Sequence, residues 1–329
     1  MQTKKIKLST ATGGTPFIKQ APGLKPVWEN CEFFINTDVA TCDLWVVYGG
    51  LAKTEHTRCP DGATLFITNE PPSVKTYAKK FTDQFDAVLT CQNIKHPHVI
   101  HTQQALPWWV GHNMRAAESS AYEKTYDELM SLPTPTKTKL LSLIVSNKRF
   151  TKGHRRRYAF AKFLKQALGD QIDIFGIDQV VEDKWDAIAP YKYHIVIENS
   201  SYDDYWTEKL ADAFLGESYP IYYGAPNIEK YFSSEMITPI DITKPQEALR
   251  TIQNLIAHDT YERSVTKLAH AKQSILNNYQ LFPMLTAYAN NLPHHKENSL
   301  RTLAPESESS IVKGIKRVWR KIKSIFSRR

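Results

Sequence analysis

The chain has few cysteines and lacks several well-known motifs. Each absence excludes or disfavours one class of binding site. Its four cysteines, Cys31, Cys42, Cys59 and Cys91, fall in the first third of the 329 residues without C-x-x-C spacing. That pattern argues against a zinc site and predicts reduced thiols in a cytosolic protein. No G-x-x-x-x-G-K-[ST] occurs, which excludes a P-loop. No D-x-D triad occurs either, so the sequence predicts no metal site and no metal held on a diphosphate.

Long apolar runs are missing as well. No stretch of about 20 apolar residues is present, so no membrane-spanning helix is expected. The first residues, MQTKKIKLSTATGG, lack the apolar core of a secretory signal. Because 42% of the residues are hydrophobic and 11% aromatic, the composition is that of a globular protein. We therefore expect a soluble, cytoplasmic protein whose length calls for two domains and a tail.

The net charge of +8 is confined to one end of the chain. Eight basic residues and no acidic one lie in 311–329, so the remainder is neutral and does not resemble a nucleic-acid-binding fold. Apolar residues, Trp319 and Phe326 among them, recur there at three- and four-residue steps opposite the basic ones. This pattern predicts an amphipathic helix lying peripherally on the inner face of the cell membrane. A helix docked on the body and an RNA-binding arm are the alternatives.

The order of apolar segments predicts an α/β protein. In residues 1–137 we expect strands at Lys4–Leu8, Glu32–Asn36, Leu44–Tyr48, Thr64–Thr68 and Ala87–Cys91, and a helix at Ser119–Leu132. In residues 138–292 we expect strands at Lys139–Val145, Ile172–Phe175, His194–Ile197 and Tyr219–Tyr223, with helices at Arg155–Leu168, Tyr205–Leu215 and within Gln246–Tyr279. This alternation is typical of a doubly wound domain. Residues 293–310 are polar, and this composition predicts a linker.

The stretch Tyr191–Gly224 carries the strongest chemical signal. A buried strand ends at Glu198-Asn199-Ser200, and a helix is expected to begin near Tyr205. Ligands of open α/β sheets bind outside the carboxyl ends of the strands, where a helix N-terminus offers N–H groups to a phosphate. Lys209 would add positive charge, and Glu208 would accept hydrogen bonds from ribose hydroxyls. The alternative for Glu208-Lys209 is a solvated pair on an amphipathic helix.

The same stretch resembles the signature of family 10 glycosyltransferases, the α-1,3/4-fucosyltransferases, in their bacterial type. The resemblance rests on Lys192-Tyr193, Glu198-Asn199-Ser200, the run Asp204–Leu210 (DYWTEKL) and the run Pro220–Gly224 (PIYYG), all with the spacing kept. It implies the GT-B architecture, in which two Rossmann-like domains face a cleft. It places the acceptor on residues 1–137 and GDP-fucose on residues 138–292.

The resemblance also implies roles for single residues. It assigns donor binding to Ser146, Asn147, Arg157, Glu198, Asn199, Tyr205, Glu208 and Lys209. Arg157 would act in catalysis on the leaving diphosphate, for which its planar, permanently charged guanidinium is suited. Glu70, between a strand and Pro71-Pro72, takes the family position of the general base. Trp108 and Trp109 lie where the family has an acceptor loop, although packing in the core is the alternative for both.

The resemblance as a whole implies an inverting fucosyltransferase. It would move fucose from GDP-β-L-fucose to an N-acetylglucosamine or glucose hydroxyl of a galactose-containing glycan, as in Lewis-type antigen or lipopolysaccharide O-chain synthesis. No metal or other cofactor is expected to be required, with stimulation by Mn or Mg left open. A GT-B enzyme using another nucleotide sugar is the first alternative. A non-catalytic basic protein that binds membrane or nucleic acid through its tail is the second.

Overall fold

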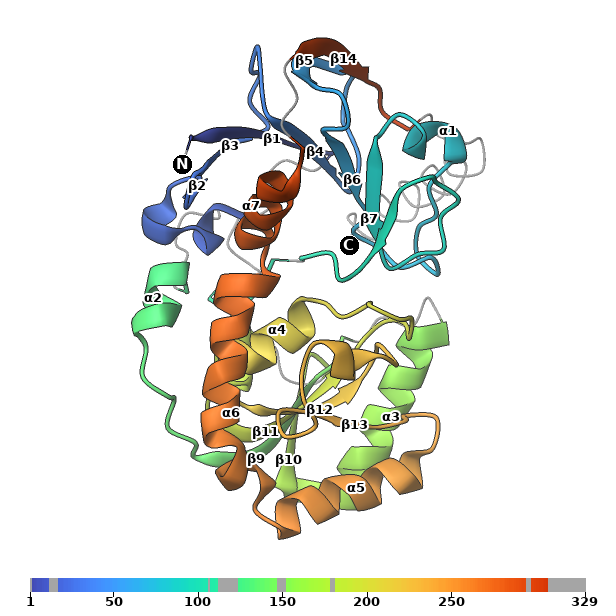
Figure 1. Ribbon diagram of the computed structural model, residues 1–329. Helices are drawn as coiled ribbons and strands as arrows, with labels where there is room; N and C mark the ends of the chain where they lie inside the picture. The colour runs from blue at the N-terminus through green and yellow to red at the C-terminus, as the bar shows by residue number, and fades with distance from the viewer. Residues whose placement is uncertain are drawn as a thin grey trace, which may run out of the picture.

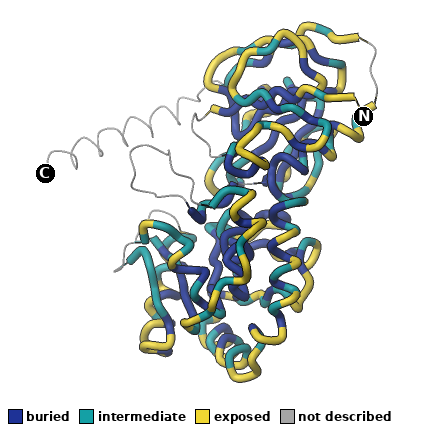
Figure 2. The backbone as a smooth tube through the Cα atoms, turned by 90° about the vertical axis from the view of Figure 1, so that its left-hand side faces the viewer, coloured by how far each residue is buried: buried dark blue, intermediate teal, exposed yellow. Residues whose placement is uncertain are grey.

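The computed structural model describes residues 2–11, 17–105, 107–111, 124–146, 152–177, 181–293 and 297–306. Within these residues the chain forms two halves, each built on a largely parallel sheet, seen one above the other in Figure 1. Buried segments run through the middle of both halves, and exposed ones lie at their edges (Figure 2). Side chains of both halves line common cavities, so the halves face one another across a cleft. This arrangement is the GT-B architecture that the sequence predicted.

The N-terminal sheet has the strand order β2-β3-β1-β4-β6-β7-β8. Its strands are β1 (Lys4–Thr10), β2 (Val27–Trp28), β3 (Cys31–Ile35), β4 (Leu44–Tyr48), β6 (Thr64–Ile67), β7 (Ala87–Thr90) and β8 (Val99–His101). All neighbouring strands are parallel except β2 and β3. β4 and β6 are buried along their whole length, as expected of parallel strands covered on both faces. The short elements of this half are η1 (Phe17–Gln20), η2 (Pro22–Leu24) and α1 (Lys79–Thr82).

The C-terminal sheet is parallel throughout, in the order β10-β9-β11-β12-β13. Its strands are β9 (Lys139–Ile144), β10 (Ile172–Phe175), β11 (Tyr191–Ile197), β12 (Tyr219–Tyr223) and β13 (Thr238–Pro239). Its helices are α3 (Lys152–Leu168), α4 (Glu208–Leu215), α5 (Pro245–Ala257) and α6 (Thr260–Ser274), with shorter turns η3 (Gly169–Gln171), η4 (Lys184–Ala187), η5 (Ile228–Lys230) and η6 (Ile275–Tyr279). The strand order reverses between β9 and β11, which is the point where doubly wound sheets bind ligands.

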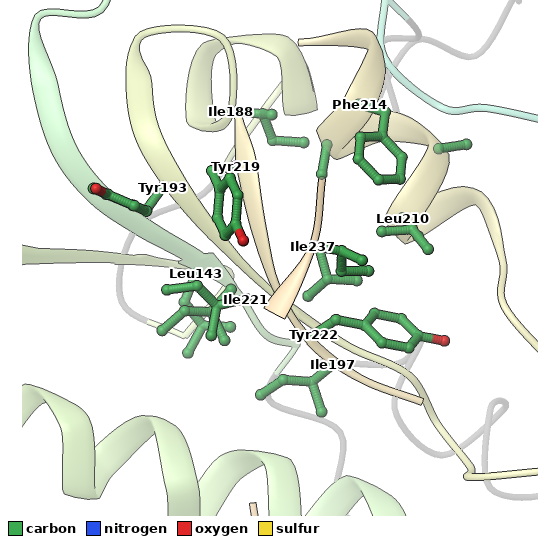
Figure 3. Close-up of a cluster of buried hydrophobic side chains, with 14 of the residues drawn as sticks. Leu143, Ile188, Tyr193, Ile197, Leu210, Phe214, Tyr219, Ile221, Tyr222 and Ile237 are labelled. Atoms are coloured by element: carbon green, nitrogen blue, oxygen red, sulfur yellow. The ribbon is translucent and has the colours of Figure 1, made fainter. Parts of the chain in front are cut away.

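Apolar side chains from strands and helices fill the core of the C-terminal half. Figure 3 shows Leu143 and Ile221 of the sheet together with Leu210 and Phe214 of α4. These four side chains are fully buried. Full burial of a Leu, Ile or Phe side chain contributes about 1.5–3 kcal/mol. Packing of α4 against the sheet therefore fixes the helix that follows the signature loop.

The last part of the chain returns to the N-terminal half, which corrects the predicted domain limits. Helix α7 (Leu281–Asn291) packs its apolar side chains into the N-terminal core, against Ile6 and Phe33. The predicted linker 293–310 contains strand β14 (Asn298–Leu303), which pairs antiparallel with β5 (Glu55–Pro60). The exchange also runs in the other direction. Trp108 and Leu129, from the first 137 residues, pack into the core of the C-terminal half. The polar composition of 293–310 concealed β14 because that strand is half exposed.

The helix predicted at Ser119–Leu132 differs in extent from the observed one. α2 (Tyr126–Ser131) is shorter than the predicted Ser119–Leu132, of which residues 119–123 lie outside the described part. Its start is set by a capping box between Thr125 and Glu128. The predicted tail helix 311–329 also lies outside the described residues. Among the helices described, none combines the length and apolarity that crossing a bilayer requires.

Candidate active site

The candidate site lies at the carboxyl ends of β9 and β11, where the strand order reverses. Ser146 follows β9, and Glu198 and Asn199 follow β11. Arg157 comes from the second turn of α3, and Glu208 and Lys209 begin α4. Elements that are far apart in sequence thus bring most of the predicted donor-binding residues to one edge of the sheet. Asn147, which was predicted with them, lies outside the described residues.

A cavity of about 280 Å³ gathers five of these residues. Its walls include Ser146, Arg157, Asn199, Glu208 and Lys209. The rest of its lining includes Trp109, Ile144, His154, Lys184, Ile188, His194, Ile195, Val196, Ile197 and Asp212. A hollow with apolar walls and a few convergent charged groups has the character of a small-molecule site.

A second cavity, of about 430 Å³, adjoins the first and shares His154 and Asn199 with it. Lys152 and Arg156 add positive charge to its lining. Ser73 and Val74 reach it from the N-terminal half. The two cavities are therefore neighbours at the cleft between the halves. The 280 Å³ cavity is partly apolar, and the 430 Å³ cavity is basic.

Arg157 is a nearly buried cation aimed at this site. Its side chain is 6% exposed, and Nη1 donates a hydrogen bond to Asn199 Oδ1. Its Nε has no hydrogen-bond partner among the described residues. Burial lowers the pKa of Arg157, while Glu198 and Glu208 raise it, so the guanidinium remains charged. A buried donor without a partner is costly, at about 1–3 kcal/mol, and a bound anion would satisfy it.

Glu198 has a structural role that the sequence did not reveal. Its side chain is fully buried and accepts hydrogen bonds from Thr207 N at 2.9 Å and Thr207 Oγ1 at 2.8 Å. Lys209 Nζ lies 3.1 Å from Glu198 Oε2. Glu198 therefore stabilises the start of α4, and it also lies in the wall of the 430 Å³ cavity. Burial raises the pKa of Glu198, an effect that Lys209 opposes.

The start of α4 also corrects the predicted phosphate site. The helix begins at Glu208 with Thr207 as its N-cap, three residues later than expected. Because the Thr207 N–H already donates to Glu198, the helix end offers fewer free donors than predicted. The positive charge at the site therefore comes chiefly from Arg157 and Lys209.

Glu208 and Lys209 form a close ion pair at the cavity wall, with Nζ 3.0 Å from Oε1. Burial alone would raise the pKa of Glu208, but Lys209 and Lys184 lower it to about 2. Burial likewise opposes the charge on Lys209, and Glu198 and Glu208 raise its pKa above the usual value. Both groups are therefore charged at neutral pH, with Glu208 able to accept hydrogen bonds from hydroxyls.

Glu70 approaches this cluster from the N-terminal half. It follows β6, and its backbone carbonyl accepts a hydrogen bond from Gln92 Nε2 at 2.7 Å. Burial raises the pKa of the Glu70 carboxyl, Lys209 lowers it and Glu208 raises it. Glu70 is therefore close enough to the first residues of α4 to interact with them electrostatically. A half-buried carboxylate with a raised pKa is suited to accept a proton from a hydroxyl.

Tyr205 is buried near the carboxylates of the site. Its side chain is 2% exposed, and it is not among the residues that line either the 280 Å³ or the 430 Å³ cavity. Burial raises its pKa, and Glu198, Glu208 and Glu70 raise it further, so the phenol stays protonated. Its direct contact with the donor stays a prediction.

The two predicted acceptor tryptophans lie elsewhere. Trp108 is 1% exposed, belongs to the core of the C-terminal half, and donates from Nε1 to the carbonyl of Lys124 at 3.1 Å. Its predicted role in acceptor binding is wrong, because the indole is covered by protein. Trp109 lines the 280 Å³ cavity, where its backbone N donates to Asp212 Oδ1 at 2.7 Å. Its position indicates the donor side of the cleft.

The sequence analysis did not predict three polar residues of the 280 Å³ cavity, which are His194, Lys184 and Asp212. His194 Nδ1 lies 2.7 Å from Ser142 Oγ, and burial lowers the pKa of His194 to about 3, so the imidazole is neutral. Lys184 Nζ lies 2.7 Å from the fully buried Asp212 Oδ2. His194 lies on β11 between Lys192-Tyr193 and Glu198 of the signature, and no motif marks it as a cavity residue.

Among the described residues, no group of three or more His, Cys, Asp or Glu side chains is arranged to hold a metal ion. The expectation that no metal is required stays a prediction.

Comparison with known proteins points to one family. Residues 134–272 match the sequence model described as glycosyltransferase family 10 (fucosyltransferase), C-terminal domain. The alpha-(1,3)-fucosyltransferase FucT of Helicobacter pylori is 32% identical over 79 residues, which are 24% of this chain and 16% of that enzyme. The 4-galactosyl-N-acetylglucosaminide 3-alpha-L-fucosyltransferase 9 of Mus musculus is 30% identical over 128 residues, which are 37% of this chain and 34% of that enzyme. These matches cover well under two thirds of either relative.

A crystal structure of an alpha1,3-fucosyltransferase shares the fold over a longer span. It matches 85% of this chain and 91% of that chain, with a TM-score of 0.50 and 17% sequence identity. At this identity the likeness concerns the fold alone.

Proposed function

We propose that this chain, which belongs to glycosyltransferase family 10 through its residues 134–272, transfers fucose from GDP-β-L-fucose to a hydroxyl of a galactose-containing glycan. The observation that carries the proposal is the 280 Å³ cavity at the β9–β11 switch point. That cavity joins Arg157, Asn199, Glu208 and Lys209, which come from three separate elements. Asn199, Glu208 and Lys209 belong to the signature stretch.

The nucleoside of the donor would lie in the 280 Å³ cavity, and its diphosphate would lie beside Arg157 and Lys209. The unpartnered Nε of Arg157 is a donor that a phosphate oxygen would satisfy. Lys152 and Arg156 of the adjoining cavity extend the positive field over the leaving group. Glu208 would accept hydrogen bonds from the ribose hydroxyls.

In the proposed reaction Glu70 accepts the proton of the acceptor hydroxyl. The hydroxyl oxygen forms a bond to C1 of fucose from the face opposite GDP, while the bond from C1 to the phosphate oxygen breaks. The electron pair of that bond leaves with GDP, whose charge Arg157 and Lys209 stabilise. Attack from the opposite face inverts C1, which turns the β-linked donor into an α-fucoside. The raised pKa of Glu70 supports its assignment as the base.

The acceptor class is supported by the names of two relatives. The mouse relative is named for 4-galactosyl-N-acetylglucosaminide acceptors and 3-α-L-fucosyl transfer. The H. pylori relative is named an α-(1,3)-fucosyltransferase. We therefore extend the proposal to an N-acetylglucosamine or glucose hydroxyl, with Lewis-type or lipopolysaccharide glycans as products. We also propose that residues 311–329 hold the enzyme on the anionic inner face of the cell membrane, because eight basic residues and no acidic one lie there.

A donor panel tests the proposal. Titration calorimetry with GDP, UDP and ADP should give clear binding for GDP only, and incubation with the corresponding sugar nucleotides should consume GDP-fucose. Arg157→Lys should weaken GDP binding at least tenfold, because an ammonium cannot reproduce the planar guanidinium contacts. Arg250→Lys, on α5 and away from both cavities, is the matched control. Equal binding of UDP, or an unchanged GDP affinity in Arg157→Lys, would contradict the proposed donor site.

A further inference from the structure

A further cavity lies beside the chain segment that follows Glu70. It encloses about 760 Å³ and is lined by both halves of the molecule. The N-terminal half contributes Pro72, Thr76, Tyr77, Lys79, Thr82, Cys91, Gln92, Asn93, Ile94, Lys95 and His101, and the C-terminal half contributes Tyr202, Asp203, Asp204 and Asn227. Its volume falls in the range of small-ligand sites.

This cavity adjoins the proposed catalytic base through the protein backbone. Pro72 lies two residues beyond Glu70 and lines the wall. Gln92, another wall residue, donates from Nε2 to the carbonyls of Glu70 at 2.7 Å and Lys75 at 2.9 Å. Tyr202 lines both this cavity and the basic 430 Å³ cavity of the donor side. A molecule in this cavity would therefore be next to the segment that carries the base and next to the 430 Å³ cavity of the donor side.

Tyr202 and Asp203 are an adjacent aromatic and acidic pair on the wall, and their side chains are exposed. Tyr202 is 37% exposed, and Asp203 is exposed as well. Among the described residues, no hydrogen bond or ion pair engages the Tyr202 hydroxyl or the Asp203 carboxylate. Tyr77, by contrast, donates from its hydroxyl to Asn69 and has Lys75 over its ring. An aromatic face and a carboxylate are thus open to a ligand.

The turn that presents these two side chains is firmly held. Asp204 has a φ of 61°, in the left-handed region that costs a residue other than glycine roughly 1–3 kcal/mol. Its Oδ1 accepts hydrogen bonds from Lys230 Nζ at 2.7 Å and from the Tyr231 hydroxyl at 2.5 Å. Lys230 Nζ also donates to the carbonyl of His101, across to the N-terminal half, at 3.1 Å. The turn is therefore fixed relative to both halves before any ligand binds.

We propose that this cavity binds the neutral sugar rings of the acceptor that do not react, with Tyr202 as the stacking platform and Asp203 accepting hydrogen bonds from a pair of hydroxyls. The chemistry of the lining favours a neutral saccharide. Amides at Gln92 and Asn93 offer both donors and acceptors, and Lys79 and Lys95 are balanced by Asp203 and Asp204. An aromatic ring covers the apolar face of a sugar, while carboxylate and amide groups bind its hydroxyls.

This assignment rests on the proposed transfer reaction, and it moves part of acceptor recognition to the half that binds the donor. The predicted acceptor tryptophans did not provide a platform, because Trp108 is covered and Trp109 lies on the donor side. Tyr202 lies within the signature stretch but between its matching residues. Its role therefore concerns which acceptor this chain takes.

The test uses the full chain and two readouts. With N-acetyllactosamine as acceptor, Tyr202→Ala should raise the acceptor KM at least tenfold and leave the Kd of GDP within twofold, while Tyr202→Phe should stay close to the parent. Asp203→Asn should raise the acceptor KM severalfold. Tyr158→Ala, an aromatic on α3 that lines a different cavity, is the matched control and should leave both constants unchanged.

Direct binding separates this inference from the proposed reaction. Saturation-transfer NMR of N-acetyllactosamine and lactose with GDP-loaded protein should show contact with the parent chain and not with Tyr202→Ala. That result would support the sugar cavity even if no fucose were transferred. In that case the proposed reaction would be wrong, and the assignment of the cavity would stand. Absence of sugar contact with the parent chain, an unchanged acceptor constant in Tyr202→Ala, or an equal loss of GDP binding would overturn the assignment.

Discussion

Replacing Lys209 by methionine should destabilise the fold in a pH-dependent way. Lys209 Nζ lies 3.1 Å from Glu198 and 3.0 Å from Glu208. The Glu198 side chain is fully buried, so without Lys209 its charge has no cationic partner in contact. Breaking a buried pair by removing one partner costs about 3–5 kcal/mol. We expect a loss of that size at pH 8.

The sign of the pH dependence follows from the pKa of Glu198. Burial already raises this pKa in the folded state, and Lys209 opposes the rise. Without Lys209 the pKa rises further above its unfolded value, so the folded variant binds a proton that the unfolded chain has released. Stability then falls as pH rises through that window, by up to about 1.4 kcal/mol per pH unit for one proton. At pH 5 protonation of Glu198 removes most of the penalty.

Urea unfolding at pH 5 and pH 8 measures the effect. The difference in free energy of unfolding between the parent and Lys209→Met should be larger at pH 8 than at pH 5 by at least about 1.4 kcal/mol. The control is Lys192→Met, which removes a half-exposed pair with Glu262 and should cost under about 1 kcal/mol at both pH values. A loss in Lys209→Met that is equal at the two pH values would refute the reasoning.

Four further outcomes follow from the same contacts. Glu70→Gln should lower kcat by about 10²–10⁴ without changing GDP affinity. In the parent, kcat should fall as pH drops through the raised pKa of Glu70, because the base becomes protonated. Near-normal transfer by the variant would show that Glu70 is not the base. Gln92→Glu loses the amide that donates to the carbonyls of Glu70 and Lys75, so kcat and its pH profile should shift while the Kd of GDP stays constant; a change in GDP affinity alone would contradict this positioning role. Lys272→Met should cost about 3–5 kcal/mol in urea unfolding, because Lys272 pairs with buried Glu217 at 3.0 Å, and a cost below 1 kcal/mol would speak against a buried ion pair. Deleting 311–329 should leave transfer to a soluble acceptor intact and abolish binding to anionic liposomes, and liposome binding that survives the deletion would rule out the anchor.

The parallel strands were the part of the fold that the sequence predicted best. β4, β10 and β12 begin and end where expected, because each is a short apolar or aromatic run bounded by polar turns. α7 was missed because Pro283 lies in its first turn, where proline fits the geometry of a helix but resembles a break in the sequence. β14 was missed because its pattern is mostly exposed and its partner β5 lies some 240 residues earlier in the chain.

Within the site, sequence predicted which residues gather but not what each one does. The signature placed Glu198 and Tyr205 beside the donor, and the structure buries both side chains, with Glu198 accepting a hydrogen bond from Thr207 at the start of α4. Such roles depend on side-chain burial, which the spacing of a motif does not encode. His194 was missed because an imidazole on a buried strand is recognised as a cavity residue only once the opposite wall is known.

Release of GDP from GDP-fucose, with and without N-acetyllactosamine, tests the central claim most directly. The protein should be truncated after Glu306 so that the basic tail does not contribute. The account predicts release that is stimulated by the acceptor, abolished in Arg157→Ala, and accompanied by an α-linked fucose in the product by NMR. Acceptor-stimulated consumption of a different sugar nucleotide, with GDP-fucose left intact, would contradict it.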